Sequence, residues 1–150
     1  MPTRKTRSAL AGGTADDVEA AFYEALQSAD IELLMACWAD DDEIVCVHPG
    51  GPRIVGPGAI RATFDHMFGN GRIQATPLQV RRLQGLSCAV HSVMERVEVM
   101  APSGPASAYV LATNVYLKTP QCWRMVAHHA SPGSEEEAQD ISEPVHHLLH

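Results

Sequence analysis

The sequence predicts an α+β domain in which helices precede a sheet of long antiparallel strands. In the first half of the chain, apolar residues recur at helical spacing in three segments. From about residue 73 onward, four strand-like segments are separated by turns at Gly85, at residues 101–105 and at Thr119-Pro120. The chain has 150 residues, of which 45% are hydrophobic, so it can bury one core of ordinary size. We therefore expect a single globular domain.

The first helix is expected over residues 15–28. Thr14 can cap it by accepting a hydrogen bond from the amide of Asp17, and acidic residues suit the positive end of the helix dipole. Its apolar positions repeat every three or four residues: Val18, Ala21, Phe22, Ala25, Leu26 and Ala29. Asp30 can cap a second, shorter helix that ends near Trp38, so the two helices form a hairpin.

Two short strands and a third helix are expected next. The apolar, β-branched segment 44–48 stops abruptly at residues 49–52, Pro-Gly-Gly-Pro, and residues 53–55 form at most a short strand. The third helix opens at Gly56-Pro57-Gly58 and ends at Gly69-Asn70-Gly71. The long strands are expected near residues 73–84, 87–100, 106–118 and 121–131.

The two ends of the chain are expected to lie outside the folded domain, which spans residues 14–132. Residues 1–13 are polar and aperiodic, which is typical of a flexible leader, and residues 133–150 form an acidic, disordered tail with three histidines. No apolar run approaches the roughly 18 residues of a membrane span, and no signal-peptide core follows the basic start. We expect a soluble, cytoplasmic protein without membrane contact.

Charge and cysteine spacing argue against two classes of function. The 11 basic and 18 acidic residues give a net charge of −7, which opposes nucleic-acid binding. The cysteines lack the close pairs of zinc sites and are expected to be buried, reduced thiols: Cys37, Cys46, Cys88 and Cys122. His128 and His129, adjacent on a strand, point to opposite faces and cannot bind one metal ion together. Neither a metal nor a cofactor is expected.

Tight turns between the long strands predict which residues face each other. A turn at residues 119–120 places Trp123 opposite Tyr116, and the 101–105 loop is taken to place Met100 opposite Ala106. One face of the sheet then collects a mixture of polar and large apolar side chains: Gln79, Arg81, Val90, Ser92, Met94, Ala112, Asn114, Tyr116, Trp123, Met125 and His129.

This mixed face is expected to line a pocket. A plain core would leave its buried polar side chains without partners, whereas ligand pockets have such a lining. The opposite face is richer in valine and leucine and suits packing against a second subunit through Val93, Val97, Leu111, Val115 and Val126. The alternative is that the mixed face is partly solvated and the other face is the core.

Two parts of the sequence carry a family resemblance. The first combines residues 22–30 (FYEALQSAD), residues 38–41 (WADD) and residues 47–49 (VHP), and the second is residues 123–131 (WRMVAHHAS). With the element order, they resemble the nuclear transport factor 2-like superfamily, which includes ketosteroid isomerase, SnoaL-type polyketide cyclases and kinase association domains. The resemblance implies a cone-shaped, cystatin-like α+β roll, in which a strongly curved mixed or antiparallel sheet and three helices enclose a cavity. It also implies a homodimer formed through the sheet.

His48 is the candidate catalytic residue. It matches the catalytic aspartate of ketosteroid isomerase, which also precedes a proline, and imidazole titrates near neutral pH. The alternative is a structural histidine that is hydrogen-bonded to the backbone at the strand end. Phe22 stands where the isomerase has its oxyanion tyrosine, and Tyr23 lies about 100° further around the helix. This substitution argues against steroid isomerisation.

The candidate binding residues are polar or aromatic: Tyr23, Arg81, Asn114, Tyr116, Trp123 and His129. The resemblance implies that Asn114 replaces a pocket arginine of association domains. We expect either a cofactor-independent isomerase, cyclase or hydratase that acts on a small apolar or amphipathic molecule, or a non-catalytic ligand-binding or homo-oligomeric assembly domain. An enclosed cavity favours the first function, and a shallow cone filled by side chains favours the second.

Overall fold

A computed structural model describes residues 10, 13–134, 136 and 139–142 of the chain. Within these residues the order of helices and strands is the predicted one, which confirms the α+β class. The elements are α2 (Ala15–Ser28), α3 (Ile31–Ala36), β1 (Val45–Val47), β2 (Arg53–Val55), α4 (Pro57–Gly69), β3 (Ala75–Gln84), β4 (Cys88–Ala101), β5 (Gly104–Thr119) and β6 (Cys122–Gly133).

The helix starts follow from their capping residues. Thr14 and Asp17 form a reciprocal capping box, since each side chain accepts a hydrogen bond from the backbone amide of the other, at 3.3 and 2.9 Å. The Asp30 carboxylate accepts a hydrogen bond from the Leu33 amide at 3.0 Å at the start of α3. α4 opens with Pro57, whose fixed φ suits the first turn of a helix. These three starts confirm the predictions.

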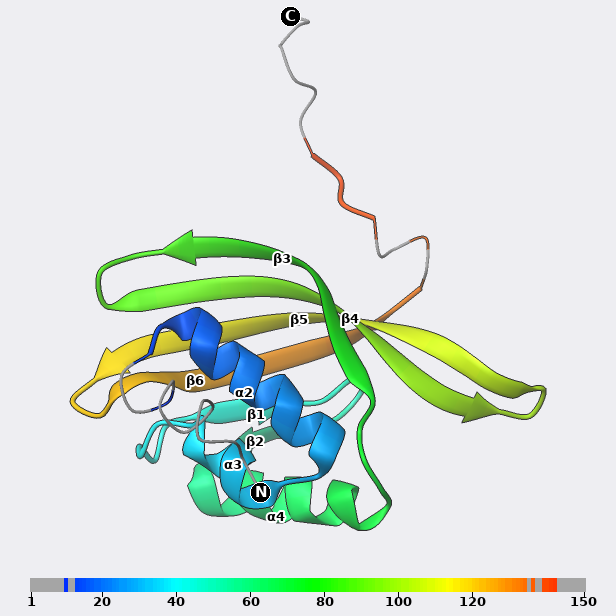
Figure 1. The fold of residues 1–150 in the computed structure, drawn as a ribbon, viewed down its shortest axis with the longest axis horizontal. Coiled ribbons are helices and arrows are strands. Elements are labelled where there is room, and N and C mark those ends of the chain that lie inside the picture. The colour runs from blue at the N-terminus through cyan, green and yellow to red at the C-terminus, as the bar shows by residue number, and fades with distance from the viewer. Residues whose placement is uncertain (1–9, 11–12, 135, 137–138, 143–150) are drawn as a thin grey trace, which may run out of the picture.

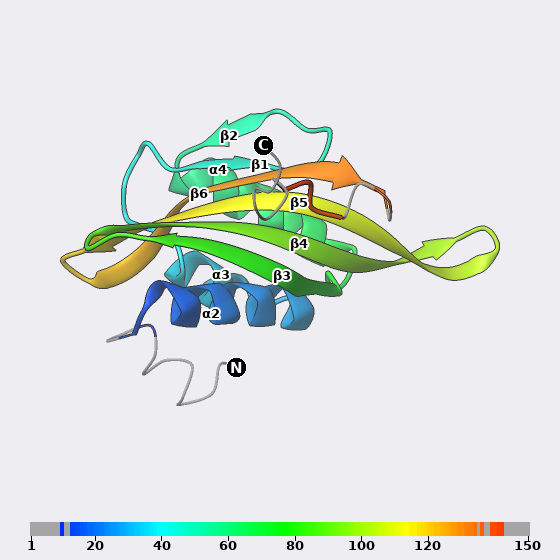
Figure 2. The same ribbon diagram turned by 90° about the horizontal axis from the view of Figure 1, so that it is seen from above.

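The six strands form one mixed sheet in the order β2-β1-β6-β5-β4-β3. β1 and β6 are parallel, and the other neighbours are antiparallel. The sheet is curved, α2 lies across one of its faces, and α3 and α4 lie along the side near β1 and β2 (Figure 1). β4 and β5 extend beyond the other strands as a two-stranded arm (Figure 2). The arrangement matches the predicted cystatin-like roll.

The predicted strand registers are wrong, and the turns explain why. Thr119 pairs with Cys122, so the turn consists of residues 120–121 and Tyr116 lies opposite Met125 instead of Trp123. A bulge next to Val115 then shifts the pairing again and places Asn114 opposite His128. The loop between β4 and β5 is also tighter than predicted, since Ala101 pairs with Gly104.

A one-residue change of register moves side chains to the other face of a strand, so the predicted pocket face is only partly correct. On β5 and β6, Asn114, Tyr116 and Trp123 do face the helices and are buried. On β4 the prediction is inverted, because His91, Val93 and Glu95 are the residues that turn inward. We call the side of the sheet that packs against the helices the inner face.

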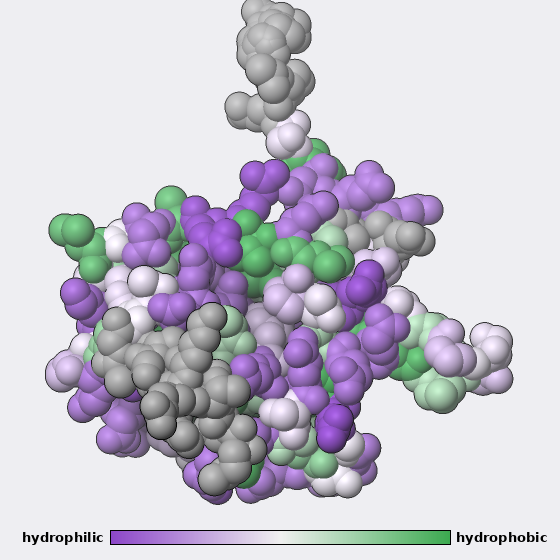
Figure 3. All heavy atoms as spheres, in the orientation of Figure 1, coloured by the Kyte–Doolittle hydropathy of each residue, from purple (hydrophilic) through white to green (hydrophobic). Residues whose placement is uncertain are grey.

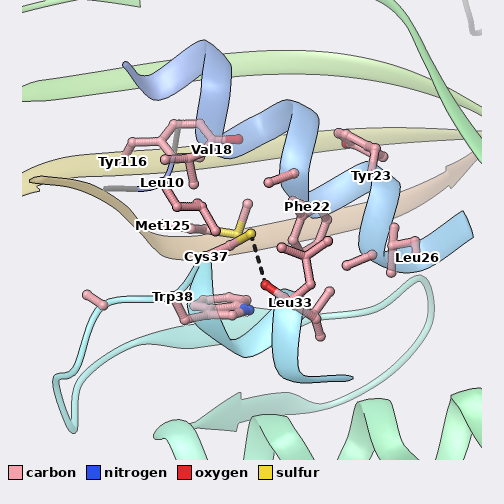
Figure 4. Close-up of a cluster of buried hydrophobic side chains, with 14 of the residues drawn as sticks. Leu10, Val18, Phe22, Tyr23, Leu26, Leu33, Cys37, Trp38, Tyr116 and Met125 are labelled. Atoms are coloured by element: carbon pink, nitrogen blue, oxygen red, sulfur yellow. Dashed lines mark hydrogen bonds between the residues drawn. The ribbon is translucent and has the colours of Figure 1, made fainter. Parts of the chain in front are cut away.

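One core lies between the inner face and the helices. Its largest fully buried side chains include Phe22, Phe64, Leu34 and Tyr116, and Figure 4 shows part of this cluster around Cys37. On the outside, the face that carries α2 is largely hydrophilic, with a smaller hydrophobic area beside β3 (Figure 3). Among the described residues, no helix has the length and apolar composition that crossing a membrane requires.

The expected leader and tail both contact the domain where the structure describes them. Leu10 is only 7% exposed and packs in the core, and its carbonyl oxygen accepts a hydrogen bond from Arg124 at 2.9 Å. The expectation that residues 1–13 do not pack is therefore wrong at Leu10. In the tail, Asp140 pairs with Arg81. The three terminal histidines lie outside the described residues.

Candidate functional site

A cavity of about 290 Å³ lies between the inner face, α2 and α4. This volume is close to the lower end of the range for small-molecule pockets. Only three of its lining residues are charged or strongly polar, namely His48, Glu95 and His128. The others are apolar: Phe22, Leu26, Pro49, Phe64, Met67, Ile73, Ala75, Val97, Val99, Ala108, Val110 and Ala130.

His48 lies directly after β1 and points to the same side as the buried Ile44 and Cys46, as predicted. Its ring stands edge-on to Phe64, with 5.0 Å between the ring centroids, and its Nε2 is 3.7 Å from the Cys46 sulfur. Among the described residues, the ring makes no hydrogen bond to a backbone carbonyl. Burial lowers the pKa of His48, so its imidazole is neutral at physiological pH and can accept a proton.

Glu95 reaches the cavity from the inner face of β4 and is only 6% exposed. Its Oε2 accepts a hydrogen bond from the Tyr23 hydroxyl at 2.5 Å. Burial raises the pKa of Glu95 to about 7, the hydrogen bond from Tyr23 opposes this rise, and the charge of Glu19 adds to it. A carboxyl group with this pKa can both donate and accept protons near neutral pH.

His128 enters the cavity from β6, with its ring centroid 5.2 Å from that of Phe22. Its Nδ1 lies 2.5 Å from the Asn114 Oδ1. Burial, together with the repulsion of a second positive charge by the nearby His48 and His129, lowers the pKa of His128 to about 3. The ring is therefore neutral, and it carries a single N–H proton.

Behind the cavity these residues join a buried polar network centred on Glu19. The Oε2 atom of Glu19 accepts hydrogen bonds from the Tyr116 hydroxyl at 2.6 Å, the Asn114 amide nitrogen at 3.3 Å and the His91 Nδ1 at 2.9 Å. The Asn114 amide nitrogen also lies 3.4 Å from the Tyr23 hydroxyl. Since these groups satisfy one another, the network holds the cavity's polar groups in fixed positions.

The structure brings three of the predicted binding residues together and separates the other three. Tyr23, Asn114 and Tyr116 belong to the buried network and do not line the cavity themselves. Tyr23 contacts Glu95 and Asn114 contacts His128, both of which line it, and Tyr116 contacts Glu19. Trp123 is buried in the hydrophobic core and does not line the cavity.

The predicted pocket positions of Arg81 and His129 are wrong. The Arg81 side chain is 72% exposed and pairs with Asp140 at 2.8 Å. Arg81 lies opposite Ser92, which is on the outer face because β4 pairs with β5 one residue away from the expected register. His129 is exposed on the outer face, because the bulge in β6 turns His128 inward instead.

Sequence reasoning missed Glu95, His128, Glu19 and His91. Glu19 lies one helical turn before Tyr23, at the edge of the apolar stripe of α2. A carboxylate at the edge of an apolar stripe is a candidate for a buried polar group, so the sequence did contain a signal for Glu19. The other three lie on strands, where only the correct register shows which face they occupy.

Comparisons with known proteins agree with this architecture. The family model of the SnoaL-like domain matches residues 16–135. A candidate calcium/calmodulin-dependent protein kinase type II association domain from Thiobacillus denitrificans is 34% identical, with a TM-score of 0.74, over 82% of this chain and 98% of that one.

Two further solved structures resemble the chain. A candidate dehydratase of the nuclear transport factor 2-like family from Streptomyces avermitilis is 29% identical, with a TM-score of 0.69, over 77% of this chain and 91% of that one. A protein with a cystatin-like fold from Caulobacter vibrioides is 14% identical, with a TM-score of 0.70, over 89% of this chain and 94% of that one, which supports the fold alone. No curated protein matches the sequence significantly.

Proposed function

The chain belongs to the SnoaL-like domain family, and from this premise we propose that it binds a small apolar or amphipathic molecule in its cavity and catalyses acid–base chemistry on it. The reaction class is isomerisation, cyclisation, or the addition or removal of water. The chain's own side chains supply the acid and the base, with His48 and Glu95 in these roles.

The observation that carries the proposal is the composition of the cavity wall. Twelve apolar residues surround His48, Glu95 and His128, and this pattern is typical of sites that orient an apolar ligand by a few polar groups. Burial raises the pKa of Glu95 to about 7, which suits a general acid, and lowers the pKa of His48, which keeps its ring unprotonated and able to accept a proton. A purely structural core would not need a histidine and a glutamate that share one cavity.

His48 and Glu95 can divide the proton transfers between them. The neutral His48 ring accepts a proton from a substrate C–H or from water, and protonated Glu95 donates one to a developing oxyanion or leaving hydroxyl group. The Tyr23 hydroxyl holds Glu95 in place by donating to Oε2, which leaves Oε1 for the substrate. The 29% identical candidate dehydratase supports water removal as one member of this class.

A paired set of variants tests whether ligands bind in the cavity. We expect small apolar ligands that raise the melting temperature of the wild-type protein to lose this effect when Ala108→Phe fills the cavity wall. Ala62→Phe, at an exposed position of α4 that does not line the cavity, is the matched control and should bind like the wild type. Equal ligand effects in both variants, or no ligand that stabilises the wild type, would contradict the proposal.

A second function, self-assembly, is favoured by the outer face of the sheet. Leu111 and Leu117 are 39% and 40% exposed there, next to Val115 on the same strand. Val93 and Val97 do not belong to the proposed interface, since they face inward and Val97 lines the cavity, which corrects the expected contact face.

The 34% identical candidate association domain supports assembly, and the exposed leucines of β5 support the outer face as the contact surface. We expect sedimentation at a mass above the 16.2 kDa of one chain, and Leu111→Glu should lower that mass by placing a charge in the interface. A concentration-independent monomer would refute assembly but leave the cavity proposal untouched.

A further inference from the structure

We propose that His128 determines ligand specificity: it presents a bare nitrogen lone pair to the cavity and thereby selects molecules that carry a hydroxyl group over matched ketones. The inference rests on the proposed function, because it takes the cavity as the ligand site. It extends that function by assigning the class of ligand, a small apolar alcohol or phenol, from the hydrogen bonds behind the cavity wall.

The side-chain amide of Asn114 has two different ends, and the groups around it fix which end faces His128. One end lies 3.3 Å from the Glu19 Oε2 and 3.4 Å from the Tyr23 hydroxyl oxygen. Tyr23 donates its own proton to Glu95, so its oxygen has lone pairs left for accepting, and a carboxylate oxygen also accepts. The end of Asn114 that faces both oxygens must therefore be the NH₂ group, and the carbonyl oxygen faces His128.

The orientation of Asn114 sets the tautomer of His128. A carbonyl oxygen can only accept, so the His128 Nδ1 at 2.5 Å must carry the proton and donate it. A neutral imidazole has one N–H, and the lowered pKa of His128 excludes the doubly protonated ring at neutral pH. Nε2 therefore has no proton and can only accept a hydrogen bond.

The Nε2 atom of His128 is open to the cavity. It has no hydrogen-bond partner among the described residues. It is also not sealed within the protein, since Trp38 Nε1 is the only fully buried and unpartnered side-chain nitrogen or oxygen in the described part of the chain. His128 lines the cavity, so a ligand is the available donor for this nitrogen.

The other polar groups of the wall cannot supply this proton to Nε2. Protonated Glu95 and the single N–H of neutral His48 can donate to a ligand carbonyl, but a ketone held in this way still brings no donor to Nε2. A ligand hydroxyl can donate to Nε2, whereas a ketone places lone pair against lone pair and leaves Nε2 unsatisfied. Leaving a buried acceptor unpaired weakens binding by about 10-fold or more.

The tautomer can be measured without a ligand. We expect ¹⁵N NMR of imidazole-labelled protein at pH 7 to show a protonated Nδ1 and a bare Nε2 for the histidine whose signals are missing from the spectrum of His128→Phe. A protonated Nε2 in His128 would overturn the inference. The tautomer is read from the wild-type spectrum and the variant serves only to assign the signal, so this readout does not depend on any activity.

Ligand selection can be measured with three probes of one skeleton: 1-indanol, 1-indanone and indane. We expect the wild type to bind the alcohol at least about 10-fold more tightly than the ketone, and His128→Phe to lose this preference while it still binds indane. His66→Phe, at an exposed histidine of α4, is the matched control and should keep the preference.

The three probes separate the two proposals. Equal binding of alcohol and ketone by the wild type would refute the role of His128 but support the cavity as a ligand site. Binding by none of the three would count against the proposed function itself, and the inference would fail with it.

Discussion

Replacing Glu95 by glutamine should change stability by an amount that depends strongly on pH. Glutamine has nearly the same shape, and its amide oxygen can still accept the hydrogen bond that Tyr23 donates at 2.5 Å. It carries no charge at any pH, so the variant lacks the desolvation penalty of a buried carboxylate. The comparison with the wild type therefore isolates the ionisation of one side chain.

The size of the effect follows from the pKa of Glu95, which burial raises from 4.5 to about 7. A carboxyl group whose folded-state pKa is raised contributes stability below its unfolded pKa, and this contribution is lost as the pH rises through the folded pKa. Each pKa unit corresponds to about 1.4 kcal/mol. Between pH 5 and pH 8.5, wild-type protein should lose about 2 to 3 kcal/mol of unfolding free energy that Glu95→Gln retains.

Urea unfolding of both proteins at pH 5 and pH 8.5 measures this difference. The lowered pKa of His128 also makes stability fall toward acid pH, but both proteins share that effect and it cancels when they are compared at each pH. Glu98→Gln, on the same strand but exposed and paired with Arg96, is the control and should change by less than about 1 kcal/mol at either pH.

The two proteins should differ least at acid pH. If Glu95→Gln shifts the unfolding free energy equally at pH 5 and pH 8.5, then Glu95 does not titrate near neutral pH in the folded protein. Its role as an acid–base group would then be refuted.

Three further changes have defined outcomes. His48→Ala should lower turnover on an identified substrate by about 10²- to 10⁴-fold. The melting temperature should change little, because the ring makes no strong hydrogen bond. Unchanged turnover would exclude His48 as the base. Tyr23→Phe removes a hydrogen bond to ionised Glu95 and should cost about 1 to 3 kcal/mol in urea unfolding, more at pH 8.5 than at pH 5; a pH-independent loss would contradict the contact. Leu10→Ala should cost about 2 kcal/mol or more, since Leu10 is buried; wild-type stability would show that residue 10 does not pack.

Local sequence signals were enough to predict the helices and the position of His48 at the end of its strand, while its catalytic role came from the family resemblance. Thr14 and Asp30 mark helix starts by their own side chains, and the proline after His48 ends its strand, so each prediction needed only neighbouring residues. His48 faces the same side as Cys46 because side chains alternate along a strand. The cavity could be expected from the family resemblance, and the structure places His48 in its wall.

The strand pairs could not be predicted in the same way, because register depends on the whole sheet. The bulge beside Val115 has no local signature, yet it decides that His128 instead of His129 turns inward. Glu95 could not be identified for the same reason, since its role requires β4 to present residue 95 opposite Tyr23 on a different element. Polar networks of this kind join residues far apart in sequence, such as Glu19 and Tyr116.

A crystal structure of the protein with its most strongly stabilising ligand tests the central claim most directly. The account predicts the ligand inside the cavity, with polar atoms within about 2.6 to 3.2 Å of Glu95 and the Nε2 atom of His128, and with a carbon or water molecule within reach of His48. A ligand bound elsewhere, or a cavity closed by its own side chains while binding persists in solution, would contradict the account.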